Sequence, residues 1–223
     1  MLIAGFQKTS FVDYPGKISS VVFTPGCNMR CWYCHNSHIT AGEVEIIEER
    51  VVIDYLLRRK DMLDGVVISG GEPTLQRDLR DFILRVKDMG YAVKLDTNGT
   101  NPALLAALMA EGLLDYVAMD IKAPFDRYRD ITGTEDDMSA IRRSVTLLMN
   151  GGVDYEFRTT FAPGLEPEDM ADLAADIAGA RRLFIQQYRP AAAGHPSPLP
   201  PSELLRAAEI ASRTLKHCAV RGL

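Results

Sequence analysis

The sequence has little that would direct the protein to nucleic acid, to a membrane or to an oxidising compartment. Its 223 residues carry 25 lysine and arginine side chains against 30 aspartates and glutamates. No block of like charge stands out, so electrostatics gives no reason to expect nucleic acid or an anionic membrane as a partner. No apolar run is long enough to cross a bilayer, and the first one is too short for a signal peptide. We therefore predict a cytoplasmic protein.

Cysteine is also scarce, and its spacing is not that of a disulfide framework. Three of the four cysteines, Cys27, Cys31 and Cys34, fall close together, and Cys218 stands alone near the C-terminus. In a reducing compartment such a trio indicates metal binding or catalysis. The apolar fraction of 47% is ample for one core, and no linker-like change of composition divides the chain. We expect one domain over residues 1–223.

Short β-rich runs alternate six times with amphipathic helices. The predicted strands cover residues 18–24, 65–69, 92–95, 116–119, 155–160 and 183–188. Because these runs are apolar on both faces, they favour a parallel sheet covered by helices. Between them, Gly90 and Gly112 are expected to end helices, and Asn101 and Ser202 are expected to cap helix starts.

Polar groups follow the predicted strands almost without exception. They are Cys27, then Gly70, Gly71 and Glu72, then Asp96, Thr97 and Asn98, then Asp120 and Lys122, whereas Arg158 lies within the fifth strand. In a barrel the carboxyl ends of all strands surround one mouth, whereas in an open sheet only the switch point forms a pocket. The distribution therefore favours an α/β fold in the form of a partial (β/α)6 barrel, since six units are too few for full closure.

The cysteine trio has the spacing C-x3-C-x2-C and directly follows the first strand, within the strand and loop over residues 18–40. Three thiolates on a tight loop can hold three irons of a four-iron, four-sulfur cube and leave the fourth iron without a protein ligand. A structural zinc site needs four protein ligands, and a cluster that only carries electrons is usually ligated by four cysteines. Zinc with His35 or His38 as fourth ligand is the competing interpretation.

This loop resembles that of the radical S-adenosylmethionine (SAM) superfamily, in which an aromatic residue, here Tyr33, precedes the last cysteine. The resemblance implies one 4Fe-4S cluster whose open iron binds SAM, and reductive cleavage of SAM to methionine and a 5'-deoxyadenosyl radical. The run Gly70-Gly71-Glu72-Pro73 is similar to the motif that binds the methionine amino group. Glycines at a strand end allow close backbone approach, and a glutamate there can pair with an ammonium.

Within the superfamily, the chain is most similar to the activases of glycyl radical enzymes, above all the activating proteins of anaerobic ribonucleotide reductase. The matching runs are Asp13–Lys17, Phe23–Asn28, Cys34–Asn36, Leu95–Gly99, Met119–Lys122 and Arg158–Thr160. The resemblance implies that Asp96, Thr97 and Asp120 help to hold a monovalent cation beside SAM, and that Lys122 and Arg158 contact its methionine part. Asn98 is expected to help place SAM. The implied partners are a glycyl radical enzyme as protein substrate and a reduced flavodoxin or ferredoxin as electron donor.

Two departures and several simpler interpretations accompany this likeness. The chain has Tyr188-Arg189 where pyruvate formate-lyase activase has a histidine, and it lacks a second cysteine-rich insert, which implies a single cluster. Glu72 could simply cap a helix, and Asp96–Gly99 could be a self-bonded turn. Cys218 is expected to be a small buried residue. A radical enzyme acting on a small molecule, such as a 7-carboxy-7-deazaguanine synthase, and a non-catalytic metal-binding or electron-carrier module stay open as alternative functions.

Overall fold

A computed structural model describes residues 1–40, 44–133, 138–191 and 194–223. Eight strands form one sheet in the order β1 to β8. They are β1 (Gly5–Ser10), β2 (Ser19–Thr24), β3 (Gly65–Gly70), β4 (Ala92–Thr97), β5 (Tyr116–Asp120), β6 (Asp154–Phe161), β7 (Leu183–Gln187) and β8 (Cys218–Arg221). β1 is antiparallel to β2, and every later neighbour pair is parallel. No pairing joins β1 to β8 in this part of the chain, so the sheet is not closed.

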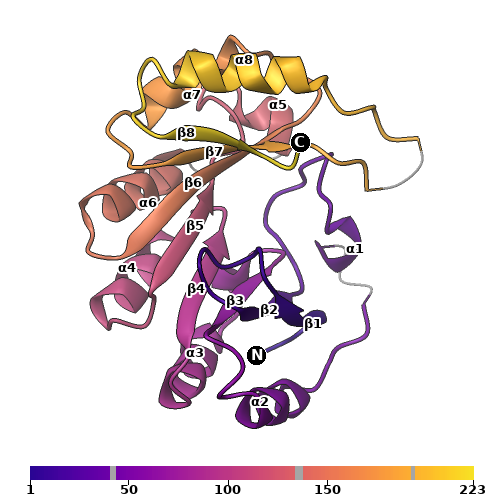
Figure 1. Cartoon of the computed structure of the whole chain (residues 1–223), viewed down its shortest axis with the longest axis vertical. Coiled ribbons are helices and arrows are strands. Elements are labelled where there is room, and N and C mark those ends of the chain that lie inside the picture. Colours follow the sequence, from indigo (N-terminus) through magenta and orange to yellow (C-terminus); the bar gives the residue numbers. More distant parts are fainter. Residues whose placement is uncertain (41–43, 134–137, 192–193) are drawn as a thin grey trace.

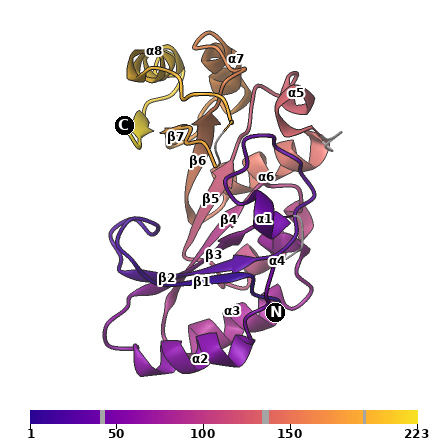
Figure 2. The same ribbon diagram turned by 90° about the vertical axis from the view of Figure 1, so that its right-hand side faces the viewer.

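Helices cover the outer side of this curved sheet (Figure 1). They are α2 (Glu49–Arg58), α3 (Leu79–Asp88), α4 (Pro102–Ala110), α6 (Met138–Asn150), α7 (Asp169–Asp176) and α8 (Pro201–Ala211). The short helix α1 (Ser37–Thr40) lies instead on the open side of the sheet. Two further short helices are α5 (Tyr128–Thr132) and the 3-10 helix η1 (Pro73–Leu75). Figure 2 shows α2 and α3 at one end of the row of strands and α7 and α8 at the other. No helix among the described residues is long and apolar enough to cross a membrane.

The six predicted strands correspond to β2 to β7, each with its bounds within two residues of the prediction. The partial barrel is therefore confirmed, and two edge strands were missed. β1 escapes a search for apolar runs because its middle is polar and exposed, and β8 escapes because it has only four residues. Edge strands need fewer apolar side chains, since one of their sides has no neighbouring strand to cover it.

The predicted helix ends are confirmed in three places and wrong in one. The Asn101 side chain accepts a hydrogen bond from the Leu104 N–H at 3.2 Å and caps α4. Gly90 and Gly112 take the left-handed φ angles of 90° and 67° just beyond α3 and α4. Ser202, however, lies inside α8, whose first turn starts with proline and whose cap position is held by Pro200. Proline suits the first helical position because its missing N–H would have no partner there.

The two faces of the sheet differ in chemistry. The outer face packs against the helices in one large apolar core. On the inner face a small apolar cluster of Tyr14, Val21, Val67, Tyr116 and Ala118 occupies the half near the start of the strands. Strand register places Asp96 beside Ala118, and Asp120 beside Arg158, further along the same face. The charged half of the inner face thus lies toward the carboxyl ends of the strands.

Candidate active site

A cavity of about 630 Å³ opens at the carboxyl ends of the parallel strands. It is lined by twelve of the thirteen residues predicted from the sequence: Cys27, Cys31, Tyr33, Cys34, Gly70, Gly71, Asp96, Thr97, Asn98, Asp120, Lys122 and Arg158. The exception is Glu72. The convergence of these residues, which come from four strands and a loop, is the arrangement expected for one barrel mouth.

The cysteine loop follows β2 and is held in place by backbone hydrogen bonds. The Gly26 N–H donates to the Ile39 carbonyl at 3.2 Å, and the Arg30 N–H donates to the Thr132 carbonyl at 3.0 Å. All four cysteines of the chain are free and half-buried. Burial raises the pKa of the Cys27 thiol, and it raises the pKa of Cys31 to about 11. Since metal binding takes up the thiolate form, loading this loop must release protons.

The donor set fits an iron–sulfur cluster. Soft thiolates are the ligands that such clusters use, and the three sulfur-bearing side chains face one cavity. The Tyr33 hydroxyl beside them is buried and has no hydrogen-bond partner in the described structure. An unpaired buried hydroxyl next to three thiols indicates that the loop is shaped for a group bound in the cavity.

No three side chains of His, Cys, Asp and Glu in the described residues lie close enough to hold a single metal ion. A cube spreads its irons over separate corners, so its thiolate ligands need not converge on one point. His35 lines the cavity. The zinc site that the sequence left open is not assembled in the described part of the chain.

The two glycines after β3 bring that strand end against the cysteine loop. The Gly71 N–H donates to the Thr24 carbonyl at 2.9 Å, and the Glu72 N–H donates to the Gly26 carbonyl at 2.8 Å. A Cβ atom on Gly71 would lie 1.8 Å from the Gly26 carbonyl oxygen. The sequence suggested that the backbone of these glycines lies close to a ligand. The structure shows that it lies close to the loop that carries the cysteines.

Glu72 is fully buried and its carboxylate is saturated by the protein. Its Oε1 accepts from the Thr74 N–H and hydroxyl at 3.1 and 2.6 Å and from the Thr97 hydroxyl at 2.7 Å, and its Oε2 accepts from the Asn98 N–H at 2.7 Å. Burial raises its pKa against the effect of these bonds. Glu72 does not line the cavity, so its carboxylate is not placed to pair with an ammonium there as the sequence suggested. Glu72 instead caps η1 and ties it to the loop after β4.

A row of paired charges crosses the floor of the cavity. The Arg158 guanidinium donates to Asp120 at 2.9 Å and to Asp96 at 3.2 Å, the Lys122 ammonium donates to Asp120 at 2.8 Å, and the Lys94 ammonium pairs with Asp96. Burial raises the pKa of Asp120, but the charges of Arg158 and Lys122 lower it further, to about 2. Both aspartates are therefore ionised at neutral pH.

Lys94 was not among the predicted site residues. It lies inside β4 with an exposed fraction of 2%. The signal was available in the sequence, because Lys94 precedes Asp96 by two residues and a strand places such residues on one face. The pattern Lys94-x-Asp96 in an apolar run therefore indicates a charge pair on one face of the strand.

The turn after β4 joins the cysteine loop through side-chain amides. The Asn98 Nδ2 donates to the Asn28 Oδ1 at 2.8 Å, and the Asn28 Nδ2 donates to the Thr100 hydroxyl at 2.9 Å. The self-bonded turn that the sequence allowed is also present, since the Thr97 Oγ1 accepts from the Gly99 N–H at 3.1 Å. Asn98 thus reaches from β4 to the loop that carries the thiols, with its Nδ2 at 4.0 Å from the Cys27 Sγ.

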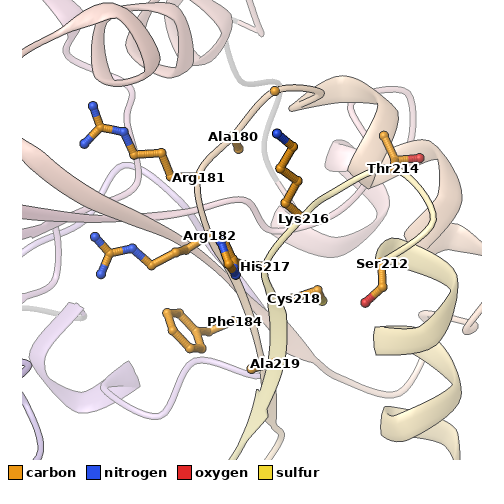
Figure 3. A pocket seen from close by; sticks show the side chains of 11 residues that line it. Ala180, Arg181, Arg182, Phe184, Ser212, Thr214, Lys216, His217, Cys218 and Ala219 are labelled. Atoms are coloured by element: carbon orange, nitrogen blue, oxygen red, sulfur yellow. The ribbon is translucent and has the colours of Figure 1, made fainter.

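A larger cavity, of about 930 Å³, lies where the chain enters β7 and β8 and contains none of the predicted site residues (Figure 3). Its lining includes the basic residues Arg181, Arg182 and Lys216, together with Cys218. Cys218 is half-buried in β8, so the expectation of a buried residue is wrong for it. Size does not mark the active site here, because the three clustered cysteines and four of the five paired charges line the smaller cavity.

Comparisons with known proteins identify the family of this chain. The family model of the Radical SAM superfamily matches residues 21–177. The Methanocaldococcus jannaschii protein MJ1227, named as a glycyl-radical enzyme activating enzyme, is 39% identical over 200 residues, which are 85% of this chain and 80% of that protein. The pyruvate formate-lyase-activating enzyme of Clostridium pasteurianum is 37% identical over 81% of this chain and 78% of its own length.

Among solved structures, Streptococcus suis SuiB has the same fold, with a TM-score of 0.70 and 15% identity over 91% of this chain and 48% of its own. The superfamily implies a 4Fe-4S cluster and SAM as cofactors. From the family model and the relatives at 37–39% identity we conclude that this chain is an enzyme of the radical SAM superfamily, related to the activating enzymes of glycyl radical enzymes.

Proposed function

We propose that this protein activates a glycyl radical enzyme and that its partner is an anaerobic ribonucleotide reductase. The observation that carries the proposal is the sharing of one cavity by three free thiols and a row of paired charges. The names of the relatives support an activase, and the sequence runs from Asp13 to Thr160 support this partner. In this proposal the chain works as one domain over residues 1–223, with the cluster held by residues 18–40.

In this proposal some residues hold the cluster and others position SAM. Cys27, Cys31 and Cys34 would hold the cluster, which leaves one iron for SAM. When bound, the cluster and SAM supply the one-electron chemistry that removes a hydrogen atom from the Cα of the partner's glycine. The electron would come from a reduced flavodoxin or ferredoxin.

The charged row supplies complementarity for a zwitterionic ligand. Lys122 and Arg158 are cations 16% and 14% exposed at the cavity, and each is held by a carboxylate. A methionine carboxylate placed beside them would make charge-assisted hydrogen bonds without reorganising the site. The same cavity is also lined by Tyr33, Thr97 and Asn98, which would contact the rest of the bound ligand.

Electron paramagnetic resonance tests the proposal directly. The reduced, reconstituted protein is mixed with SAM and either an anaerobic ribonucleotide reductase or a pyruvate formate-lyase, and the glycyl doublet is recorded. We expect the doublet with the reductase and none when Cys34 is replaced by alanine or when the partner's radical glycine is replaced by alanine. A doublet with pyruvate formate-lyase alone would assign a different partner. SAM cleavage without a doublet in either mixture would contradict an activase.

A further inference from the structure

Lys94 is the most buried member of the charged row, and it lies behind Asp96 without lining the cavity itself. Its side chain is 2% exposed, and its neighbours in register are Val67 on β3 and Tyr116 on β5. Burying an ammonium among such groups is strongly unfavourable unless a carboxylate compensates its charge. Asp96, two residues further along β4, provides that carboxylate.

Lys94 and Arg158 together use both oxygens of Asp96. Lys94 pairs with Oδ1 and Arg158 with Oδ2, at 3.2 Å for the latter. Burial raises the pKa of Asp96, but the charges of Arg158 and Lys94 outweigh it and hold this pKa below its ordinary value. The carboxylate is thus ionised and already has a cationic partner on each oxygen.

The other two groups that could serve a metal ion are engaged in the same way. Asp120 gives Oδ1 to Arg158 at 2.9 Å and Oδ2 to Lys122 at 2.8 Å. The Thr97 hydroxyl donates to Glu72 and accepts from the Gly99 N–H. A monovalent cation, which the family resemblance places at Asp96, Thr97 and Asp120, would have to bind the remaining lone pairs of these oxygens, directly beside the positive charges of Lys94, Arg158 and Lys122.

The balance of charge points the same way. The row holds three cations, Lys94, Arg158 and Lys122, and two carboxylates, Asp96 and Asp120. The nearby carboxylate of Glu156 is paired with Arg221, so an excess of one positive charge remains. A metal ion would raise this excess to two in a site where no member is more than 26% exposed. The residues of this chain therefore do not fit the cation that the family implies.

We infer that Lys94 is the resident cation of the Asp96 carboxylate, so that this protein binds SAM without a monovalent metal ion. In this arrangement Lys94 is a positioning residue. It neutralises one side of Asp96, and Asp96 in turn holds Arg158 in the cavity. The inference rests on SAM binding alone and does not depend on which protein is the substrate.

The test is equilibrium binding of SAM to the reconstituted wild-type protein, without a partner, in potassium, sodium or tetramethylammonium salts of equal ionic strength. We expect dissociation constants that agree within roughly twofold, because no site distinguishes the three cations. The tetramethylammonium ion is too large to enter a metal site. A loss of affinity for SAM of about fivefold or more in its salt would therefore overturn the inference.

The variant Lys94→Met leaves one oxygen of Asp96 open and removes the excess charge. We expect its affinity for SAM to fall about tenfold in tetramethylammonium and to recover in potassium or ammonium, which can enter the vacated place. Equal affinity of this variant in all salts would contradict the role assigned to Lys94. Lys87→Met is the matched control. Lys87 pairs with Asp115 at 2.8 Å and does not line the cavity, so this variant should change neither the affinity for SAM nor its dependence on the cation. Should Lys94→Met not fold, the wild-type comparison decides the matter.

Discussion

Replacing Asp120 by asparagine should destabilise the protein in a way that depends on pH. Asp120 is the hub between Lys122 and Arg158, and its side chain is 26% exposed. Its pKa falls from 3.8 to about 2 in the folded chain, in spite of burial, because of the two neighbouring cations. At roughly 1.4 kcal/mol for each unit of pKa, this shift corresponds to about 2 kcal/mol of stability at neutral pH.

The direction with pH follows from the lowered pKa. The stabilisation is fully present above the ordinary carboxyl pKa of 3.8 and is lost as the pH falls through the folded value of about 2. In the variant this contribution is absent at every pH. The difference between wild type and Asp120→Asn should thus be about 2 kcal/mol at pH 7 and roughly half of that at pH 3.

Urea unfolding of the cluster-free protein at pH 7, 4 and 3, followed by circular dichroism, measures this difference. Asp154→Asn is the control, because Asp154 also pairs with an arginine, Arg182 at 2.5 Å, but is 51% exposed. Solvent screens such a pair, so its loss should cost under about 1 kcal/mol. If Asp120→Asn unfolds at the wild-type urea concentration, or if its loss of stability stays constant down to pH 3, the two ion pairs do not stabilise the fold in the way described.

Three further changes test separate parts of the structure. Cys31→Ala should remove most iron and acid-labile sulfide from the anaerobically reconstituted protein, whereas Cys218→Ala should keep the wild-type content; equal loss in both would exclude Cys31 as a specific ligand. Gly71→Ala should cost about 1–3 kcal/mol in urea unfolding, because its Cβ would lie 1.8 Å from a carbonyl oxygen, and Gly152→Ala, with nothing within 4 Å, should cost little. Asn101→Ala should cost about 1 kcal/mol by removing a helix cap, whereas Ser202→Ala should be neutral, since Ser202 lies within α8; the opposite ranking of melting temperatures would restore Ser202 as the cap.

Much of the site was predictable because its chemistry is local in sequence. The three cysteines stand within one loop, Asp96 and Asp120 stand at or near the ends of apolar strands, and Arg158 lies in the carboxyl half of the next strand. Parallel strands carry their carboxyl ends to one edge, so the meeting of these groups follows from the order of elements alone. The same argument gave the partial barrel.

The orientation of Glu72 could not be obtained in this way. Its place after two glycines suggested a ligand contact, but four donors from Thr74, Thr97 and Asn98 turn the carboxylate inward. Two of these donors come from the last residue of β4 and the residue after it, more than twenty positions away in the sequence. A buried carboxylate turns toward the hydrogen-bond donors that can satisfy it. These donors are distant in the sequence, so only the packed fold brings them together.

The sequence by itself determined the cysteine loop, the six parallel units and the position of the mouth, since each depends on spacing along the chain. The tertiary structure decided which charges neutralise one another. Asp96 is shared by Lys94 and Arg158 from β6, and Glu156 is paired with Arg221 from the unpredicted β8, at 2.7 Å and 65 positions away. Such pairs depend on the register of the strands and on the curvature of the sheet, which brings side chains of different strands together on its inner face. A local sequence pattern determines neither property.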